Sequence, residues 1–155
     1  MYSNELVCKI LNYIDENINN RISIDDLSKF FNYNRYYIMK LFKRELNISI
    51  IEYINIVRIN NSLEYIKNNY SFLSIALVNG FYSLEYYSEI FKKVLGVNPS
   101  TYKKLINRNN NLSEKKMDIC TTHLAYIKKI IDKCNKYKDN IKPSVLPVKK
   151  LSIFK

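Results

Sequence analysis

Residues that interrupt helices are scarce in this sequence, which contains 2 Gly and 3 Pro among its 155 residues. Few helix breakers favour helix throughout, and no strand-type alternation is sustained before the last dozen residues. Long apolar runs are also lacking, since none approaches the roughly 20 residues of a membrane span. The N-terminal residues show no basic segment followed by an apolar core, so we expect no signal peptide.

Cysteine and histidine are scarce as well. Cys8, Cys120 and Cys134 are odd in number and widely spaced, which argues against a disulfide framework and for a reducing cytoplasm. With 1 His and no pairing of a nucleophile with a base, the sequence gives catalysis no support. Cys120, His123 and Cys134 lack a second pair at zinc spacing and do not predict a metal site. We therefore expect no enzyme activity, no metal and no cofactor.

Positive charge is plentiful, with a net charge of +11 and a pI near 9.5. Such a balance favours a polyanionic partner, either nucleic acid or a membrane surface. The abundant Asn, Ile, Lys and Tyr share A/T-rich codons, so the number of lysines alone is a weak argument. Most of the excess charge also lies after residue 106. Whether the positive charge indicates a nucleic-acid partner must therefore be judged from where the charged residues lie in the sequence.

Residues 22–46 predict two helices joined by a tight turn. Ser23 suits an N-cap, and Asp25 and Asp26 place negative charge at the positive end of the first helix. Asn32 and Asn34 flank the turn, and Asn tolerates the left-handed backbone that sharp turns need. Apolar residues at helical spacing are expected to face inward: Leu27, Phe30 and Phe31, then Ile38, Leu41, Phe42 and Leu46. An acidic helix, a short turn and a basic, aromatic helix are typical of a DNA-binding helix-turn-helix.

The next segments predict a rod followed by a second such motif. After a first helix over 4–19, a long helix is expected over 49–68, with Arg58 at least half-buried and in need of a partner. Its more buried side is predicted to comprise Tyr53, Ile54, Val57, Asn61, Leu63 and Ile66. The second motif is expected to have the same construction as the first. It consists of a short helix over 74–79, a turn at Gly80 with a positive φ, and a helix from Leu84 that is capped by Ser83. Its inward residues are expected to be Tyr87, Ile90, Phe91, Val94 and Leu95. Gly96 ends that helix, and Pro99 begins a last short one.

These two motifs resemble the DNA-binding domain of the AraC/XylS family of transcription regulators, over about residues 4–105. The most specific stretch is IALVNGFYSLEYYSEIFKKVLGVNPSTYKK, and LSKFFNYNRYYIMKLFKRELNISIIEYI matches closely as well. Asn32 and Asn47 stand where the family has glycine. The resemblance implies an all-α fold with two helix-turn-helix subdomains joined by a long central helix, to which the residue pattern after 107 adds a C-terminal helical and extended tail. It also implies that two recognition helices enter successive major-groove segments.

The resemblance assigns roles by motif position. The residues expected to face DNA bases are Tyr36, Met39 and Lys40 in the first motif and Leu84, Glu85, Tyr86 and Glu89 in the second. The residues expected to contact the DNA backbone are Asn34, Arg35, Lys43, Arg44, Lys92, Lys93, Lys103 and Lys104. Lys40 can donate to guanine N7 and O6. Glu89 stands where the family often has a basic residue. Its carboxylate is repelled by the DNA phosphates unless it accepts a hydrogen bond from a cytosine amine. We expect the first motif to carry most of the specificity; a solvent-facing role for Glu85 and Glu89 is equally open.

The remaining residues form an appendage. We divide the chain into a DNA-binding domain, 1–107, and a basic segment, 108–155, with a linker at 108–113, an amphipathic helix over 122–137 and an extended end after Pro143. The apolar side of that helix is predicted to comprise Leu124, Ile127, Ile130, Ile131, Cys134 and Tyr137. This side must meet the DNA-binding domain, a second copy or RNA polymerase.

The favoured function is a cytoplasmic, sequence-specific transcription regulator whose partners are double-stranded DNA and RNA polymerase. One alternative is a protein-interaction module that docks a partner through the C-terminal helix, with residual DNA binding. Another is a basic amphipathic helix that lies on a membrane surface.

Overall fold

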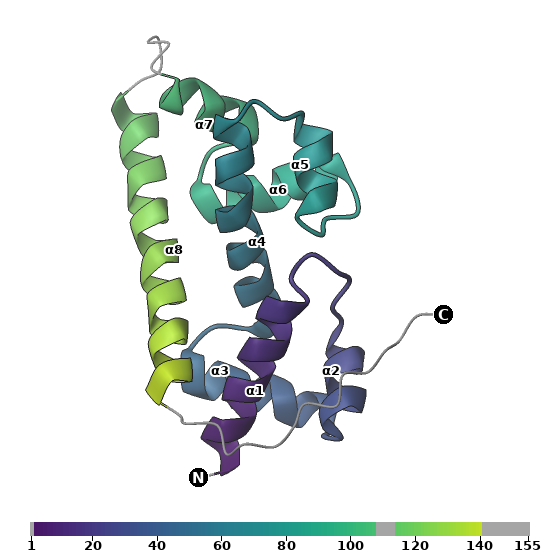
Figure 1. The fold of residues 1–155 in the computed structure, drawn as a ribbon. Helices are drawn as coiled ribbons and strands as arrows, with labels where there is room; N and C mark the ends of the chain where they lie inside the picture. The colour runs from purple at the N-terminus through teal and green to yellow at the C-terminus, as the bar shows by residue number, and fades with distance from the viewer. Residues whose placement is uncertain (1, 108–113, 141–155) are drawn as a thin grey trace.

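The computed structural model describes residues 2–107 and 114–140, and the regular secondary structure within these ranges is α-helical. The helices are α1 (Tyr2–Glu16), α2 (Ile24–Phe31), α3 (Arg35–Leu46), α4 (Ile50–Lys67), α5 (Phe72–Val78), α6 (Leu84–Leu95), α7 (Pro99–Ile106) and α8 (Glu114–Asn140). Helix α4 is central, with the pair α2–α3 (the first unit) at one end, the pair α5–α6 (the second unit) at the other, and α8 alongside (Figure 1). The predicted all-α fold with two helix-turn-helix units is confirmed. The predicted linker at 108–113 and the extended end after Pro143 lie outside the described residues.

The first unit forms as its residue pattern predicts. Ser23 caps α2 in a capping box with Asp26. Asn32 and Asn47 end α2 and α3 in the left-handed conformation, with φ of 58° and 60°. The predicted inward residues of α3 are buried: Ile38, Leu41, Phe42 and Leu46. One expectation is wrong, because Phe30 is 38% exposed, although its ring packs 4.6 Å from that of Tyr13.

Helices α1 and α5 have other bounds than the sequence predicts. Helix α1 spans residues 2–16 and not 4–19, because the chain turns at Asn17, whose N–H bonds back to the carbonyls of Tyr13 and Ile14. Helix α5 begins at Phe72 and not Ser74, because Ser71 is its N-cap and accepts from the Ser74 amide at 3.2 Å.

Helix α4 is buried on more than one side. Ile56, Ile59 and Ser62 are buried, whereas Asn61, which we expected on the buried side, is exposed. The reason is that α4 packs against α3, α5, α6, α7 and α8, so its buried residues do not form a single stripe. An amphipathic pattern has little predictive value for a helix enclosed in this way.

Helix α8 is longer than the predicted 122–137 and runs along one side of the fold (Figure 1). Cys120, Ile127 and Cys134 are buried, and the helix packs against α1, α4 and α6. For these residues, the apolar side of α8 therefore packs against α1, α4 and α6 of the same chain. Within the described ranges, no helix is long and apolar enough to cross a membrane.

Arg58 of α4 joins the two halves of the molecule. It is only 8% exposed, and its Nε and Nη2 donate to the carbonyls of Ile18 at 2.9 Å and Asn20 at 2.7 Å. Its guanidinium also lies 5.8 Å from the ring centroid of Phe81, in the turn of the second unit. The expected partner of Arg58 is therefore the loop between α1 and α2.

We predict that Arg58→Met lowers the free energy of unfolding by about 3 kcal/mol, because the Ile18 carbonyl loses the donor of a buried hydrogen bond and the Asn20 carbonyl that of a partly buried one. Urea denaturation at pH 7 measures this loss. Lys67→Met, an exposed lysine on the same helix, is the matched control and should change stability by less than about 1 kcal/mol. Equal losses for the two variants would contradict the role given to Arg58.

Candidate nucleic-acid interface

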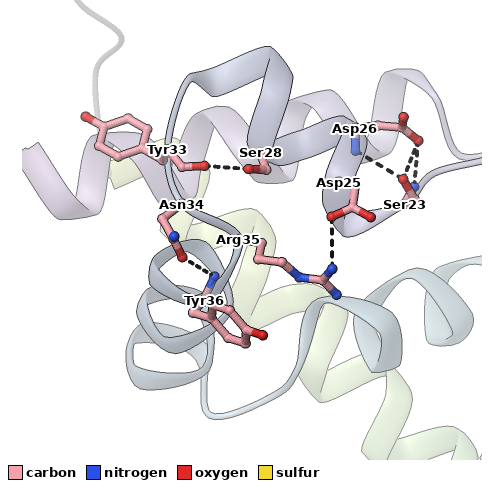
Figure 2. A network of polar contacts seen from close by, with 8 residues as sticks. All are labelled: Ser23, Asp25, Asp26, Ser28, Tyr33, Asn34, Arg35 and Tyr36. Carbon is pink, nitrogen blue, oxygen red and sulfur yellow. Dashed lines mark hydrogen bonds and ion pairs between the residues drawn. The ribbon is translucent and has the colours of Figure 1, made fainter.

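The turn of the first unit fixes the start of α3 (Figure 2). The Asn34 side chain accepts from the Tyr36 amide at 2.8 Å, and the Ser28 hydroxyl donates to the Tyr33 carbonyl at 2.6 Å. A salt bridge of 3.1 Å joins Arg35 Nη1 to Asp25 Oδ1 of α2. The first turn of α3 is thus held by its own cap and tied to α2.

The second unit repeats this construction. Ser83 is the N-cap of α6 and accepts from the Tyr86 amide at 3.1 Å. Counting from the two N-caps, Glu85 occupies the position of Tyr36, and Glu89 occupies the position of Lys40. Two helices built alike therefore differ in charge at equivalent outer positions.

A pair of stacked tyrosines marks the start of each recognition helix, as we call α3 and α6. Tyr33 and Tyr37 stack with ring centroids 5.5 Å apart, and Tyr82 and Tyr86 stack at 4.7 Å. Tyr82 is 77% exposed and was absent from the predicted site. A signal existed in the sequence: in both units a tyrosine precedes the N-cap and another follows four residues later. These rings add exposed aromatic surface beside the predicted base-facing residues.

The residues predicted to face bases divide into two groups. Tyr36, Met39, Lys40, Glu85 and Glu89 are exposed on the recognition helices. By contrast, Leu84 packs against the core and is half-buried, and so is Tyr86, whose ring lies between those of Tyr82 and Phe81. The exposed group is free to approach a ligand, whereas the other two side chains also serve packing.

The basic residues at the ends of the recognition helices have local partners. Lys43 Nζ donates to the Asn47 carbonyl at 3.4 Å, and Arg44 pairs with Glu45 at 2.8 Å. Lys92 and Lys93 are exposed in the last turn of α6, at the positions that Lys43 and Arg44 occupy in α3.

The two lysines predicted on α7 lie elsewhere. Lys103 is half-buried, with Nζ 5.8 Å from the ring centroid of Phe72, the first residue of α5, and Lys104 is exposed. Both lie on α7, at the other end of α4 from the first unit (Figure 1), and Lys103 lies near the start of α5.

A groove of about 760 Å³ brings several predicted contacts of the first unit together. Met39, Lys40, Lys43 and Arg44 line it, together with the first residues of α4, Ser49 to Ile51. Three cationic side chains in one groove suit an anionic ligand. Among the described residues, no group of three or more His, Cys, Asp and Glu could hold a metal ion.

Two carboxylates of this region act in helix caps. The hydroxyl and amide of Ser23 donate to Asp26 Oδ2 at 2.6 and 3.1 Å, which lowers the pKa of that carboxyl. In the same way, the Ser49 amide donates to Glu52 at 3.0 Å and lowers its pKa at the start of α4. The helices that support α3 therefore depend on ionised carboxylates.

Comparison with known proteins identifies the kind of domain. The family described as "Helix-turn-helix domain" matches residues 27–105. The HTH-type transcriptional activator AarP of Providencia stuartii is 28% identical over 103 residues, 66% of this chain and 76% of AarP. The transcriptional regulatory protein HptR of Staphylococcus aureus is 31% identical over 66% of this chain, but the match spans 41% of HptR. The C-terminal domain of AraT, a response regulator from Geobacillus stearothermophilus, has a similar structure, with a TM-score of 0.61 and 26% identity over 70% of this chain and 88% of that domain.

We predict that Asp26→Ala lowers stability by about 0.5–1 kcal/mol at neutral pH, because α2 loses a carboxylate from its first turn. The pKa of Asp26 in the folded protein lies below its ordinary 3.8. Its contribution is therefore present above pH 3.8 and is lost as the pH falls through the folded pKa. Urea denaturation of both proteins between pH 7 and pH 2.5 should show the gap closing at the acidic end. Asp132→Ala, an exposed aspartate on α8, should show no such convergence.

Proposed function

Because this chain belongs to the AraC/XylS family of DNA-binding transcription regulators, we propose that it binds a specific duplex sequence by inserting α3 and α6 into two successive major-groove segments. The supporting observation is that one capped, tyrosine-stacked helix start occurs twice, at the two ends of α4. The 18 residues of α4 extend over roughly 27 Å, which is close to the roughly 34 Å repeat of B-DNA.

The first unit carries most of the sequence recognition in this proposal. Lys40 donates to guanine N7 and O6, and Tyr36 and Met39 contact neighbouring base edges. Arg35, Lys43 and Arg44 contact phosphates, which adds affinity without sequence information. The groove between this face of α3 and the start of α4 brings Lys40, Lys43 and Arg44 together on one surface.

The second unit recognises DNA more weakly or selects cytosine. Glu85 and Glu89 are exposed at the positions of Tyr36 and Lys40, and a carboxylate in the major groove is repelled by phosphate unless it accepts from a cytosine amine. Lys92 and Lys93 offset that repulsion from the last turn of α6.

The two alternative functions, docking of a protein partner and binding to a membrane surface, both require the apolar side of α8 to be accessible. Ile127 and Cys134 of that side are buried against the rest of the protein, which leaves little apolar surface for a partner or a membrane. RNA polymerase remains the protein partner that this family implies for a regulator bound near a promoter. We likewise propose that the DNA-binding domain comprises residues 1–107 and that a separate basic segment begins at residue 108.

We predict different effects for two neighbouring lysines. Lys40→Ala should reduce discrimination at one base pair by about 1–3 kcal/mol, whereas Lys43→Ala should weaken binding to all duplexes and lower the salt slope by about 1. Selection of bound duplexes from a random pool gives the preferred sequence, and titrations at several salt concentrations then measure both quantities.

Lys128→Ala is the control for this pair, because Lys128 is an exposed lysine of α8. It should leave both discrimination and the salt slope unchanged. Identical effects of Lys40→Ala and Lys43→Ala would refute the assigned roles, and binding of the unmodified protein without any sequence preference would refute the proposed function.

We also predict that Asp25→Asn strengthens DNA binding, because it frees Arg35 from its salt bridge for phosphate contact. Exposed ion pairs contribute at most about 1 kcal/mol, so the gain should be at most about fivefold. Protein stability should fall by no more than about 1 kcal/mol, because α2 loses one of the two carboxylates in its first turn. In a double variant with Arg35→Gln the gain should disappear. A gain that persists there would mean that the removed negative charge, and not Arg35, is responsible.

A further inference from the structure

Helix α8 lies beyond the family match, which ends at residue 105. Its buried residues Cys120, Ile127 and Cys134 recur at seven-residue intervals. A seven-residue repeat places them on one side of the helix, as in a coiled coil. Helix α8 therefore contacts the DNA-binding domain along a single stripe that extends over most of its length.

One part of this stripe meets the end of the first recognition helix. Lys133 Nζ donates at 3.0 Å to the carbonyl of Leu46, the last residue of α3. Tyr137 Oη donates at 3.5 Å to Glu45 in the same turn. The last carbonyls of a helix have no partner within it and carry partial negative charge, so an ammonium group there is favourable.

Another part meets the end of the second recognition helix. Gly96 ends α6 with φ 76°, and a Cβ at this position would lie 2.5 Å from Ile119 Cγ2 and 3.0 Å from His123 Cε1. The ring of His123 is itself held by a 2.8 Å hydrogen bond between Nδ1 and the Ile119 carbonyl. The contact is thus so close that α8 leaves no room for a side chain at the end of α6.

We propose that α8 sets the distance and angle between the two recognition helices, and thereby the spacing of the two DNA segments that the protein accepts. The inference rests on the proposed function. Each recognition helix ends against α8, and the two contacts, at Ile119 and Lys133, are separated by roughly 21 Å of helix. Simultaneous binding of both units raises affinity only where their spacing matches that of the DNA.

The test uses the full chain with Lys133→Met and Tyr137→Phe, which removes both polar contacts to α3 and keeps the apolar bulk. The matched control is Lys129→Met with Tyr126→Phe, two exposed residues of the same types on the same helix. Thermal unfolding first establishes that all three proteins are folded. Affinity is then measured for the selected operator and for duplexes with one or two base pairs added or removed between its two contacted segments.

A second measurement needs no DNA. Spin labels are introduced through unnatural amino acids at Lys29 in α2 and Leu73 in α5, both exposed and outside the recognition helices. Pulsed dipolar spectroscopy then gives the distribution of distances between the two units.

We expect the unmodified protein and the control to lose about tenfold or more in affinity when the spacing changes. The Lys133/Tyr137 variant should lose only about threefold, and its distance distribution should broaden. An unchanged spacing profile with an unchanged distribution would overturn the inference, as would equal effects in the control. If the unmodified protein ignores both sequence and spacing, the proposed function fails, and the distance measurement still reports whether α8 fixes the two units.

Discussion

A buried charge between the two units is the constraint on which the rest of the structure depends. The guanidinium of Arg58 remains ionised although burial lowers its pKa, and an ion removed from water is tolerated only with full compensation. Its acceptors are the carbonyls of Ile18 and Asn20, and the ring of Phe81 lies beside it. At Gly80 a Cβ would lie 2.9 Å from the Ile18 carbonyl. Moving the second unit away would remove the ring of Phe81 from beside this charge, so Arg58 favours one arrangement of the two units.

The two units share a scaffold and differ on their outer faces. Each recognition helix has a side-chain N-cap, a stacked tyrosine pair and a left-handed residue at its end, which is Asn47 in α3 and Gly96 in α6. Because these features are common to both, the helices are presented in the same way. Lys40 and Glu89 therefore give opposite charge to equivalent positions of two helices that are held alike.

Local features could be predicted from the sequence, and features that depend on distant packing could not. The N-caps, the left-handed Asn32 and Asn47 and the inward face of α3 follow from interactions within a few residues. The exposure of Asn61 does not, because it depends on how the neighbouring helices enclose α4. Tyr82 was predictable in part. The sequence shows that it precedes its N-cap as Tyr33 does, but its exposure is known only from the structure. Of the candidate site, the recognition helices were predicted, whereas the half-burial of Leu84 and Tyr86 required the structure.

Because the arrangement of the recognition helices is fixed, the DNA has to deform to fit them, and this deformation costs free energy. Besides α4 and Arg58, α8 adds a third connection: Lys138 pairs with Asp15 of α1, which also accepts from the Tyr53 hydroxyl of α4 at 3.0 Å. Bending a duplex site by 40–90° costs on the order of 1–6 kcal/mol, and the cost depends on its sequence. A protein that cannot adjust its own spacing therefore discriminates among duplexes by their deformability between the two contacted segments. In the proposed mechanism, specificity thus has a second source, at base pairs that no side chain touches.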